Sequence, residues 1–220
     1  MKFEYKKDPM GIERESFEII DGIVANSSRI YPSADPLIQN IYRRVIHTSA
    51  DFDYLDNLKI EDDFINAFSE VITNENPALV TVYTDTNMVL SGINKAAFNQ
   101  TGWQLKCFVA NEEAKTLAKE QGITRSMASI QLALKEPGKK IFVFGNAPTA
   151  IFQVLDLQDA FKDSLIGIIG VPVGFVGAEE SKLALYNSTI PCITALGRKG
   201  GSNVAASIVN ALVYHFKERA

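Results

Sequence analysis

Five short runs of aliphatic and β-branched residues are spaced along the last two thirds of the chain. Most of them are continuously apolar rather than alternating, which is typical of strands covered on both faces. We expect each run to form a strand. The runs are Leu79–Asp85, Leu105–Ala110, Lys140–Asn146, Ile166–Val171 and Pro191–Leu196.

Segments that look helical separate these strands, and the last of them closes the chain. Strands that alternate with helices form right-handed βαβ units, which build a mostly parallel sheet with helices on both faces. The sequence therefore predicts an α/β fold with three layers, αβα, around a five-stranded sheet. The helical segments are Asn111–Gln121, Arg125–Lys135, Pro148–Phe161, Glu179–Tyr186 and Ser202–Arg219.

The first 75 residues show no convincing strand. Asp35–Thr48 and Glu61–Thr73 look helical, so we expect a helical N-terminal lead-in packed on the same sheet. No internal repeat, low-complexity stretch or linker divides the chain. We therefore expect residues 1–220 to form a single domain.

Composition narrows the class of protein. The chain has 220 residues, 46% of them hydrophobic and 22% charged, which suffices for one buried core. A net charge of −4 gives no global electrostatic reason to expect nucleic acid or an anionic membrane. We find no signal peptide and no apolar run long enough to span a bilayer. Cys107 and Cys192 lie in apolar runs and read as reduced thiols, so we expect a cytoplasmic protein.

Small residues fill the turns that follow four of the predicted strands. These turns are Asp85–Met88, Gly145–Ala150, Pro172–Gly177 and Gly197–Ser202. Ligands of such sheets bind beyond the carboxyl ends of the strands, where glycine allows close approach and helix N-termini attract anions. Each turn alone could be an ordinary connection. Their combined placement, with arginines nearby, favours a site for a ligand that carries several carboxylates.

Nucleotide and serine-nucleophile chemistry find little support. In Gly197–Ser202 the lysine precedes the paired glycines, whereas a P-loop lysine follows them. Gly145–Ala150 does not match a dinucleotide-binding turn, and no G-x-S-x-G motif occurs. NAD and ATP are therefore disfavoured, and a non-standard phosphate site remains a minority alternative. No metal-ligand spacing is evident, so we expect no metal.

Two histidines occur in the chain, and His47 is the better candidate for proton chemistry. On a helix, Arg44 and His47 are three residues apart and project from one face. The alternative is that His47 is a cation at a helix C-terminus, and the residues alone leave both readings open. Arg125, at a helix start, and Arg14 could bind carboxylates or could be solvated surface charges. His215, on the final helix, reads as a surface or partly packed residue.

Seven motifs, taken in chain order, resemble those of the precorrin-8X methylmutase family. Any one of them is weak, but together they run from about residue 14 to the final helix, and all seven in order are specific. The motifs are Ser16-Phe17, Arg44–His47, Asp85 with Met88, Thr124–Ser126, Gly145–Ala150, Pro172–Gly177 with Glu180–Lys182, and Gly197–Ser202.

The resemblance implies an isomerase of cobalamin (vitamin B12) biosynthesis. Such an enzyme moves a methyl group from C-11 to C-12 of precorrin-8 or cobalt-precorrin-8, giving hydrogenobyrinate or cobyrinate. The migration is intramolecular, so the resemblance implies no methyl donor and no cofactor. It also implies a flavodoxin-like fold and a homodimer with sites close to the subunit interface. Within this resemblance, the sequence of Tyr83–Leu90 favours the cobalt-bearing substrate of the anaerobic branch over the metal-free one.

The resemblance also assigns residues to the site. It implies that His47 is the catalytic acid, that Ser16 and Arg44 contact the corrinoid, and that Arg125 lies at the site. Other substrate-binding positions follow from the motifs and are Arg14, Asp85, Met88, Thr124, Ser126, Asn146, Gly174, Phe175, Arg198, Gly200 and Gly201.

Two alternatives to an isomerase remain, and both are binding proteins. The first is a non-catalytic tetrapyrrole-binding or carrier protein on the same fold, which would keep the arginines and the glycine turns but would have no use for His47. The second is a nucleotide-binding flavodoxin-like protein.

Overall fold

The computed structural model describes residue 5, residues 7–74, residue 76 and residues 79–218, with side chains described as far as residue 216. Arg219, the end of the predicted C-terminal helix, lies outside the described residues. The elements in chain order are α1 (Pro9–Ala25), α2 (Pro36–Ser49), α3 (Tyr54–Asn57), β1 (Leu58–Ile60), α4 (Asp62–Asn74), β2 (Val80–Thr84), α5 (Asn87–Gly92), α6 (Lys95–Phe98), the 3₁₀ helix η2 (Asn99–Thr101), β3 (Gln104–Lys106), α7 (Glu112–Gln121), α8 (Arg125–Lys135), β4 (Lys139–Phe144), α9 (Pro148–Asp156), α10 (Gln158–Phe161), β5 (Leu165–Gly170), α11 (Ala178–Tyr186), β6 (Cys192–Ala195) and α12 (Ser202–Glu218).

The sheet has six strands in the order β1-β6-β5-β4-β2-β3. Each of the five predicted runs contributes to a strand, and these strands pair in parallel. Of the run Leu105–Ala110, however, only Leu105 and Lys106 belong to β3, and the rest is loop. The prediction of a five-stranded sheet was wrong, because Leu58–Ile60 adds β1, antiparallel to β6. Three residues are too few to show a strand pattern. Leu58 becomes extended by pairing with Ala195 along the free edge of β6, and its carbonyl accepts the Tyr42 hydroxyl proton at 2.8 Å.

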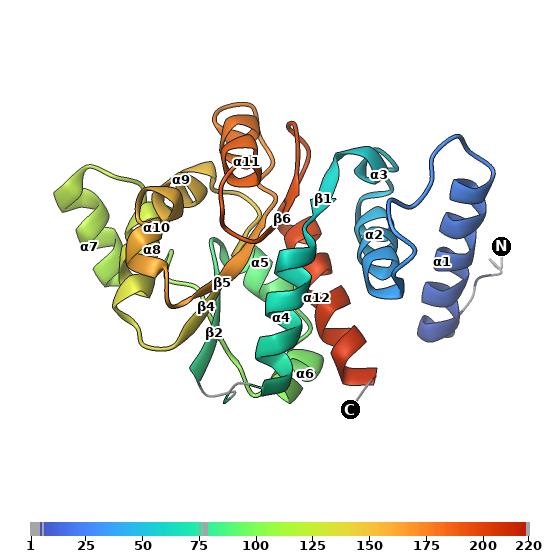
Figure 1. The fold of residues 1–220 in the computed structure, drawn as a ribbon, viewed down its shortest axis with the longest axis horizontal. Coiled ribbons are helices and arrows are strands. Elements are labelled where there is room, and N and C mark those ends of the chain that lie inside the picture. The colour runs from blue at the N-terminus through green and yellow to red at the C-terminus, as the bar shows by residue number, and fades with distance from the viewer. Residues whose placement is uncertain (1–4, 6, 75, 77–78, 219–220) are drawn as a thin grey trace.

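Helices cover both faces of the sheet (Figure 1). Along β4, Ile141 and Val143 point into one core, whereas Phe142 and Phe144 point into the other. Helices α4, α5 and α12 contribute to the first core, and helices α8, α9 and α11 to the second. Helices on both faces of the sheet are therefore as the apolar runs predicted. The central strands β2, β4, β5 and β6 are buried, whereas the edge strand β3 is exposed to half-buried.

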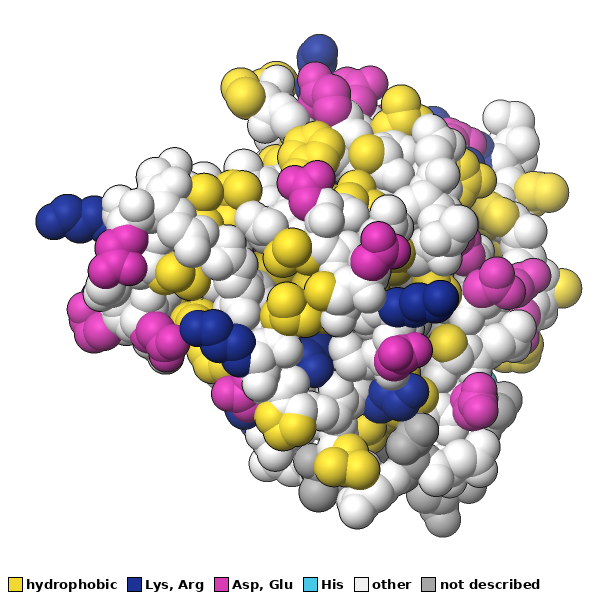
Figure 2. All heavy atoms as spheres, turned by 60° about the vertical axis from the view of Figure 1, so that its left-hand side comes forward, with side chains coloured by type: hydrophobic (Ala, Val, Ile, Leu, Met, Phe, Trp, Pro, Cys, Tyr) yellow, Lys and Arg dark blue, Asp and Glu magenta, His cyan; other side chains and the backbone are white. Residues whose placement is uncertain are grey.

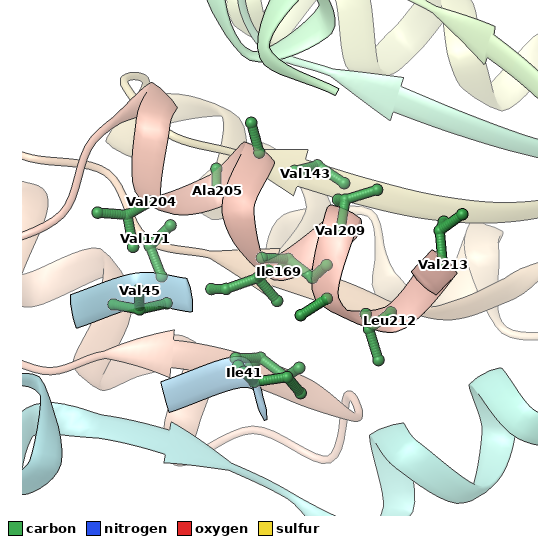
Figure 3. Close-up of a cluster of buried hydrophobic side chains, with 14 of the residues drawn as sticks. Ile41, Val45, Val143, Ile169, Val171, Val204, Ala205, Val209, Leu212 and Val213 are labelled. Carbon is green, nitrogen blue, oxygen red and sulfur yellow. The ribbon is translucent and has the colours of Figure 1, made fainter. Parts of the chain in front are cut away.

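The N-terminal helices are not all on the sheet. Helix α4 packs on β5 and β6, as expected, but α2 packs on α12 and α1 packs on α2. Figure 3 shows side chains of α12, among them Val209 and Leu212, in one buried cluster with Val143 and Ile169 of the sheet and with Ile41 of α2. Because α12 covers this part of the sheet, α2 and α1 form further layers outside it, with α1 at the edge of the molecule (Figure 1).

One predicted helix is interrupted. The segment Pro148–Phe161 forms α9 and α10, which are separated at Leu157 (φ −104°, ψ 14°). The break allows Phe161 to lie fully buried beside Phe142, with ring centroids 5.3 Å apart. Helices α1, α3, α5 and α6 had no counterpart among the predicted segments.

In the part of the chain that the structure describes, no helix is long and apolar enough to cross a membrane. Positive and negative side chains are interspersed on the face shown in Figure 2, which is the face that carries the left-hand helices of Figure 1.

Both cysteines are free thiols, with Cys192 buried and Cys107 partly so.

Candidate functional site

The buried carboxylate of Asp85 organises the carboxyl edge of the sheet. Asp85 directly follows β2, and its oxygens accept N–H bonds from Gly145 (3.1 Å), Asn146 (2.7 Å) and Ala147 (2.7 Å). Burial raises the pKa of the Asp85 carboxyl, and the three backbone donors oppose that rise. The observed contacts of Asp85 are therefore internal, and they fix the turn between β4 and α9.

The loops after β5 and β6 form one unit at the same edge. The N–H of Gly174 donates to the Arg198 carbonyl at 3.1 Å, and the N–H of Gly201 donates to the Val171 carbonyl at 2.9 Å. Gly200 has no room for a side chain, because a Cβ there would overlap the Val171 carbonyl oxygen. This close approach explains why glycine stands at that position.

An arginine and an aromatic ring stand out from these two loops. Phe175 is 84% exposed, and the guanidinium of Arg198 lies 5.7 Å from its ring centroid. Arg198 also lies 3.7 Å from the Glu179 carboxylate, at the start of α11. The pair offers a ligand an apolar surface beside a positive charge.

Two helix N-termini meet next to these loops. The Thr124 hydroxyl caps α8 by accepting the N–H of Met127, and it is 3.0 Å from the hydroxyl of Thr149 in the first turn of α9. Arg125 is exposed and Ser126 is partly exposed at the same helix start, and Asn146 is exposed on the turn before α9. Exposed Met88 lies in the first turn of α5, after β2.

His47 lies in the last turn of α2 and is exposed. Its ring meets the edge of Phe17 at a centroid distance of 5.6 Å and an interplanar angle of 88°. The next residue, Thr48, accepts a hydrogen bond on its carbonyl from the Asn203 amide at 3.3 Å. Because Asn203 is in the first turn of α12, this bond ties the His47 end of α2 to the carboxyl edge of the sheet.

Arg44 lies one turn earlier and is largely enclosed, with 16% of its side chain exposed. One guanidinium nitrogen is 2.7 Å from Glu13, and the group lies over the rings of Tyr214 (4.6 Å) and Phe17 (5.2 Å). Its Nε atom is buried and has no hydrogen-bond partner among the described residues. Arg44 is thus held in place by Glu13 and the two rings, with its buried Nε–H group unpaired among the described residues.

Ser16 and Arg14 belong to α1. The Ser16 hydroxyl donates to the Ile12 carbonyl at 2.8 Å, one turn back on the helix. Arg14 is exposed and lines a groove of about 650 Å³ between α1, α2 and the end of α12, which Arg44 also lines.

The predicted site residues therefore form two groups joined at the end of α2. Arg14, Ser16, Arg44 and His47 lie on α1 and α2. The others lie on the turns and helix starts at the carboxyl edge and are Asp85, Met88, Thr124, Arg125, Ser126, Asn146, Gly174, Phe175, Arg198, Gly200 and Gly201. These placements leave the substrate-binding role of each residue a prediction.

Several residues next to the site were not among the predicted site residues, although Lys182 belongs to one of the seven motifs. Glu13 and Tyr214 contact Arg44 from distant parts of the chain, and no local pattern could reveal them. Lys182 is fully buried, and its Nζ donates to the Lys199 carbonyl at 2.7 Å. The sequence did carry a signal for Lys182, because it shares the helical spacing of the buried residues of α11, namely Ala178, Ser181 and Leu185.

Among the residues that the structure describes, no group of three or more His, Cys, Asp or Glu side chains could hold a metal ion.

This fold and site define an α/β protein in which polar loops and helix starts gather at the carboxyl edge of a mostly parallel sheet, the usual ligand position in open sheets. The family model for CbiC, precorrin-8X methylmutase, matches residues 11–215. The chain belongs to the precorrin-8X methylmutase family, a family of isomerases, and the resemblance of its motifs is confirmed.

Its relatives match over almost their whole length. A cobalt-precorrin-8 methylmutase of Salmonella typhimurium is 47% identical over 215 residues, covering 97% of this chain and 99% of the relative. A precorrin-8X methylmutase of Pseudomonas aeruginosa is 33% identical over 211 residues, covering 95% and 97%. The crystal structure of a precorrin-8x methyl mutase from Thermus thermophilus has a TM-score of 0.80 at 28% identity and covers 96% of this chain and 97% of its own.

Proposed function

We propose that this protein moves a methyl group from C-11 to C-12 of cobalt-precorrin-8 to give cobyrinate, in cobalamin biosynthesis. Family membership supports the methyl migration. The cobalt-bearing substrate is favoured because the relative with 47% identity is named for it, whereas the relative named for precorrin-8X is 33% identical.

The observation that carries the proposal is the placement of His47. This histidine is exposed at a helix end that a hydrogen bond ties to the carboxyl edge, where arginines and helix starts gather. As the bond from the methyl carbon to C-11 breaks and the bond to C-12 forms, the His47 side chain donates a hydrogen bond to that part of the ring, or a proton that returns to it as the product forms. The migration is internal, so no donor is consumed. A positioned acid contributes about 10²–10⁴-fold to the rate.

The surrounding groups suit a ring fringed with acetate and propionate side chains. Exposed Arg125 and Arg198 supply positive charge, and the N-termini of α8 and α9 add the positive ends of two helix dipoles. Phe175 and Met88 are exposed apolar groups that would pack against the ring. From α1 and α2, we assign Arg14, Ser16 and Arg44 to the same substrate.

We also propose a flavodoxin-like connectivity and a single domain over residues 1–220. The five parallel strands, numbered along the chain from β2, stand in the order 2-1-3-4-5, which is the flavodoxin-like order. The proposal includes a cytoplasmic location and no bound cofactor, since the migration needs none.

A homodimer completes the proposal. Met10, Ile12, Ile19 and Ile23 are exposed on α1, at the edge of the molecule, and would be covered by a second copy. Sedimentation velocity at micromolar concentration tests this, and a monomer of 24.2 kDa would contradict it.

The decisive experiment compares the wild type with His47→Ala and, as a matched control, His215→Ala. With cobalt-precorrin-8, the wild type and the control should develop the visible spectrum of cobyrinate, and His47→Ala should lose turnover by at least about 100-fold. His47→Ala that turns over at the wild-type rate would refute the catalytic role. A wild type that binds the substrate without converting it would support the carrier alternative instead.

A further inference from the structure

The segment 197–201 is fastened along its length to the loop that follows β5. The N–H of Gly174 and the N–H of Gly201 form the two backbone hydrogen bonds described above. These bonds leave the side chain of Lys199 directed away from the β5 loop, toward a different element.

Lys199 joins this segment to the chain that follows α2. Its Nζ is 2.6 Å from an oxygen of Asp51 and 2.6 Å from an oxygen of Asp53. Both carboxylates lie within three residues after Ala50, which follows α2 as its C-cap in the left-handed conformation (φ 54°). The last turn before Ala50 carries His47.

The α2 end is thereby held on both sides. The Asn203 amide bonds to the Thr48 carbonyl just after His47, and the Lys199 ammonium holds the carboxylates just after Ala50. Arg29 adds a second cation to Asp53 at 2.8 Å and so fixes the acceptor of the Lys199 bond.

Lys182 holds the same segment from within the fold. The lysine is fully buried, and its Nζ donates to the Lys199 carbonyl at 2.7 Å. Burial lowers the pKa of Lys182 to about 8, although Glu179 opposes this. A buried ammonium is a poor contributor to stability compared with an apolar side chain of the same size. Stability therefore does not explain why a lysine stands at position 182. Holding the segment 197–201 in a fixed position does.

We propose that Lys199, held in turn by Lys182, is a positioning residue that fixes the end of α2 and thereby the imidazole of His47 against the carboxyl edge. The catalytic consequence rests on the proposed function, whereas the geometric claim does not. The ion pairs are part-exposed, with 43% of the Lys199 side chain accessible, so they contribute little to stability. An acid displaced by about 1 Å, in contrast, loses up to about 100-fold in rate.

The first test measures turnover and stability of Lys199→Met and Lys199→Arg. Lys115→Met is the matched control, because Lys115 is also 43% exposed and also 2.6 Å from a carboxylate, that of Glu112. We expect Lys199→Met to lower kcat on cobalt-precorrin-8 by at least about tenfold with KM nearly unchanged. Lys199→Arg should restore most of kcat, and all variants should keep the wild-type Tm within a few degrees.

The second test does not depend on activity. Because the chain has two histidines, its imidazole C–H signals are two sets, and loss of one set in His47→Ala assigns them. The His47 ring lies edge-on to Phe17, so its chemical shift reports its position. Lys199→Met should move the His47 signals and leave those of His215 in place, and Lys115→Met should move neither.

These outcomes separate the two claims. A wild type without turnover, together with moved His47 signals in Lys199→Met, would refute the proposed function and support the positioning role. Unchanged kcat with unmoved signals would overturn the positioning role. A tenfold rise in KM at unchanged kcat would also overturn it, because Lys199 would then bind substrate.

Lys182→Met provides an independent variant with a side chain of similar length and no charge. We expect its kcat to fall in the same direction as that of Lys199→Met while its Tm stays equal to or above that of the wild type. Lys182→Met with full kcat and unmoved His47 signals would remove Lys182 from the proposal.

Discussion

Arg44 and His47 show what local spacing can predict about single residues. Three residues apart on α2, they were expected on one face, and both contact Phe17, which confirms that expectation. The spacing could not reveal Phe17 itself, nor the ring of Tyr214 beneath the Arg44 guanidinium. Those contacts come from α1 and α12, which only the packing of the helices brings to α2.

Lys182 makes the stability of the protein depend on pH. Its pKa is about 8 in the folded protein against an ordinary value of 10.5, because burial disfavours the ammonium. Between these two pH values the unfolded chain therefore binds more protons than the folded protein. The charged Lys182 destabilises the folded protein fully below about pH 8, and this destabilisation disappears as the pH rises toward 10.5. Relative to Lys182→Met, the wild type should gain on the order of 3 kcal/mol of unfolding free energy across that interval.

Urea unfolding of both proteins at several pH values between 7 and about 10.5 measures this difference directly. The comparison with Lys182→Met cancels the titration of the tyrosines, cysteines and remaining lysines. If the unfolding free energies of the two proteins changed with pH in parallel, the Lys182 ammonium would not be desolvated in the folded protein.

At the scale of elements, the carboxyl-edge loops depend on close backbone approach. A Cβ at Gly200 would overlap the Val171 carbonyl, so Gly200→Ala must shift the loop and should lower the unfolding free energy by about 1–3 kcal/mol. Gly22→Ala is the matched control, because nothing lies within 4 Å of a Cβ there and the residue is in the interior of α1. The control should be stabilised by roughly 0.5–1 kcal/mol.

Urea unfolding midpoints give both values. A Gly200→Ala protein as stable as the wild type would mean that the loop adapts at no cost, and the argument that glycine is required there would fail.

Elements were predictable where their pattern was long enough. The five runs predicted as strands carry four or more apolar residues each, and the long helices have apolar positions at helical spacing. Strand β1 has three residues and forms only because the edge of β6 is available. The break between α9 and α10 follows from the burial of Phe161, a tertiary effect that a helical pattern across Pro148–Phe161 conceals.

At the scale of the whole molecule, α12 joins the outer N-terminal helices to the sheet (Figure 3). Leu212 is fully buried there, so Leu212→Ala should lower the unfolding free energy by about 2–5 kcal/mol. Because one core spans α2, α12 and the sheet, unfolding should remain a single transition. Leu183→Ala, at an exposed leucine on α11, should change stability by no more than about 0.5 kcal/mol.

Far-ultraviolet circular dichroism and the fluorescence of Trp103, the single tryptophan, follow the helices and the core during the same urea titration. Coincident curves are expected. Separate transitions by the two probes would contradict the single domain and would place α1 and α2 in an independent unit.

The sequence by itself determined the class of fold, the five parallel strands and the family, because continuous apolar runs, helical spacing and ordered motifs are local features of a chain. It also located the residues proposed for the site. Tertiary structure alone decided that α1 and α2 lie outside α12 and that a sixth strand, β1, is added at the edge beside β6. It also decided that the Asp85 carboxylate accepts three backbone N–H groups. It alone brought Lys182, Lys199 and the α2 end together. The reason is physical: these arrangements depend on contacts between residues far apart in the chain, which periodicity along the chain does not encode.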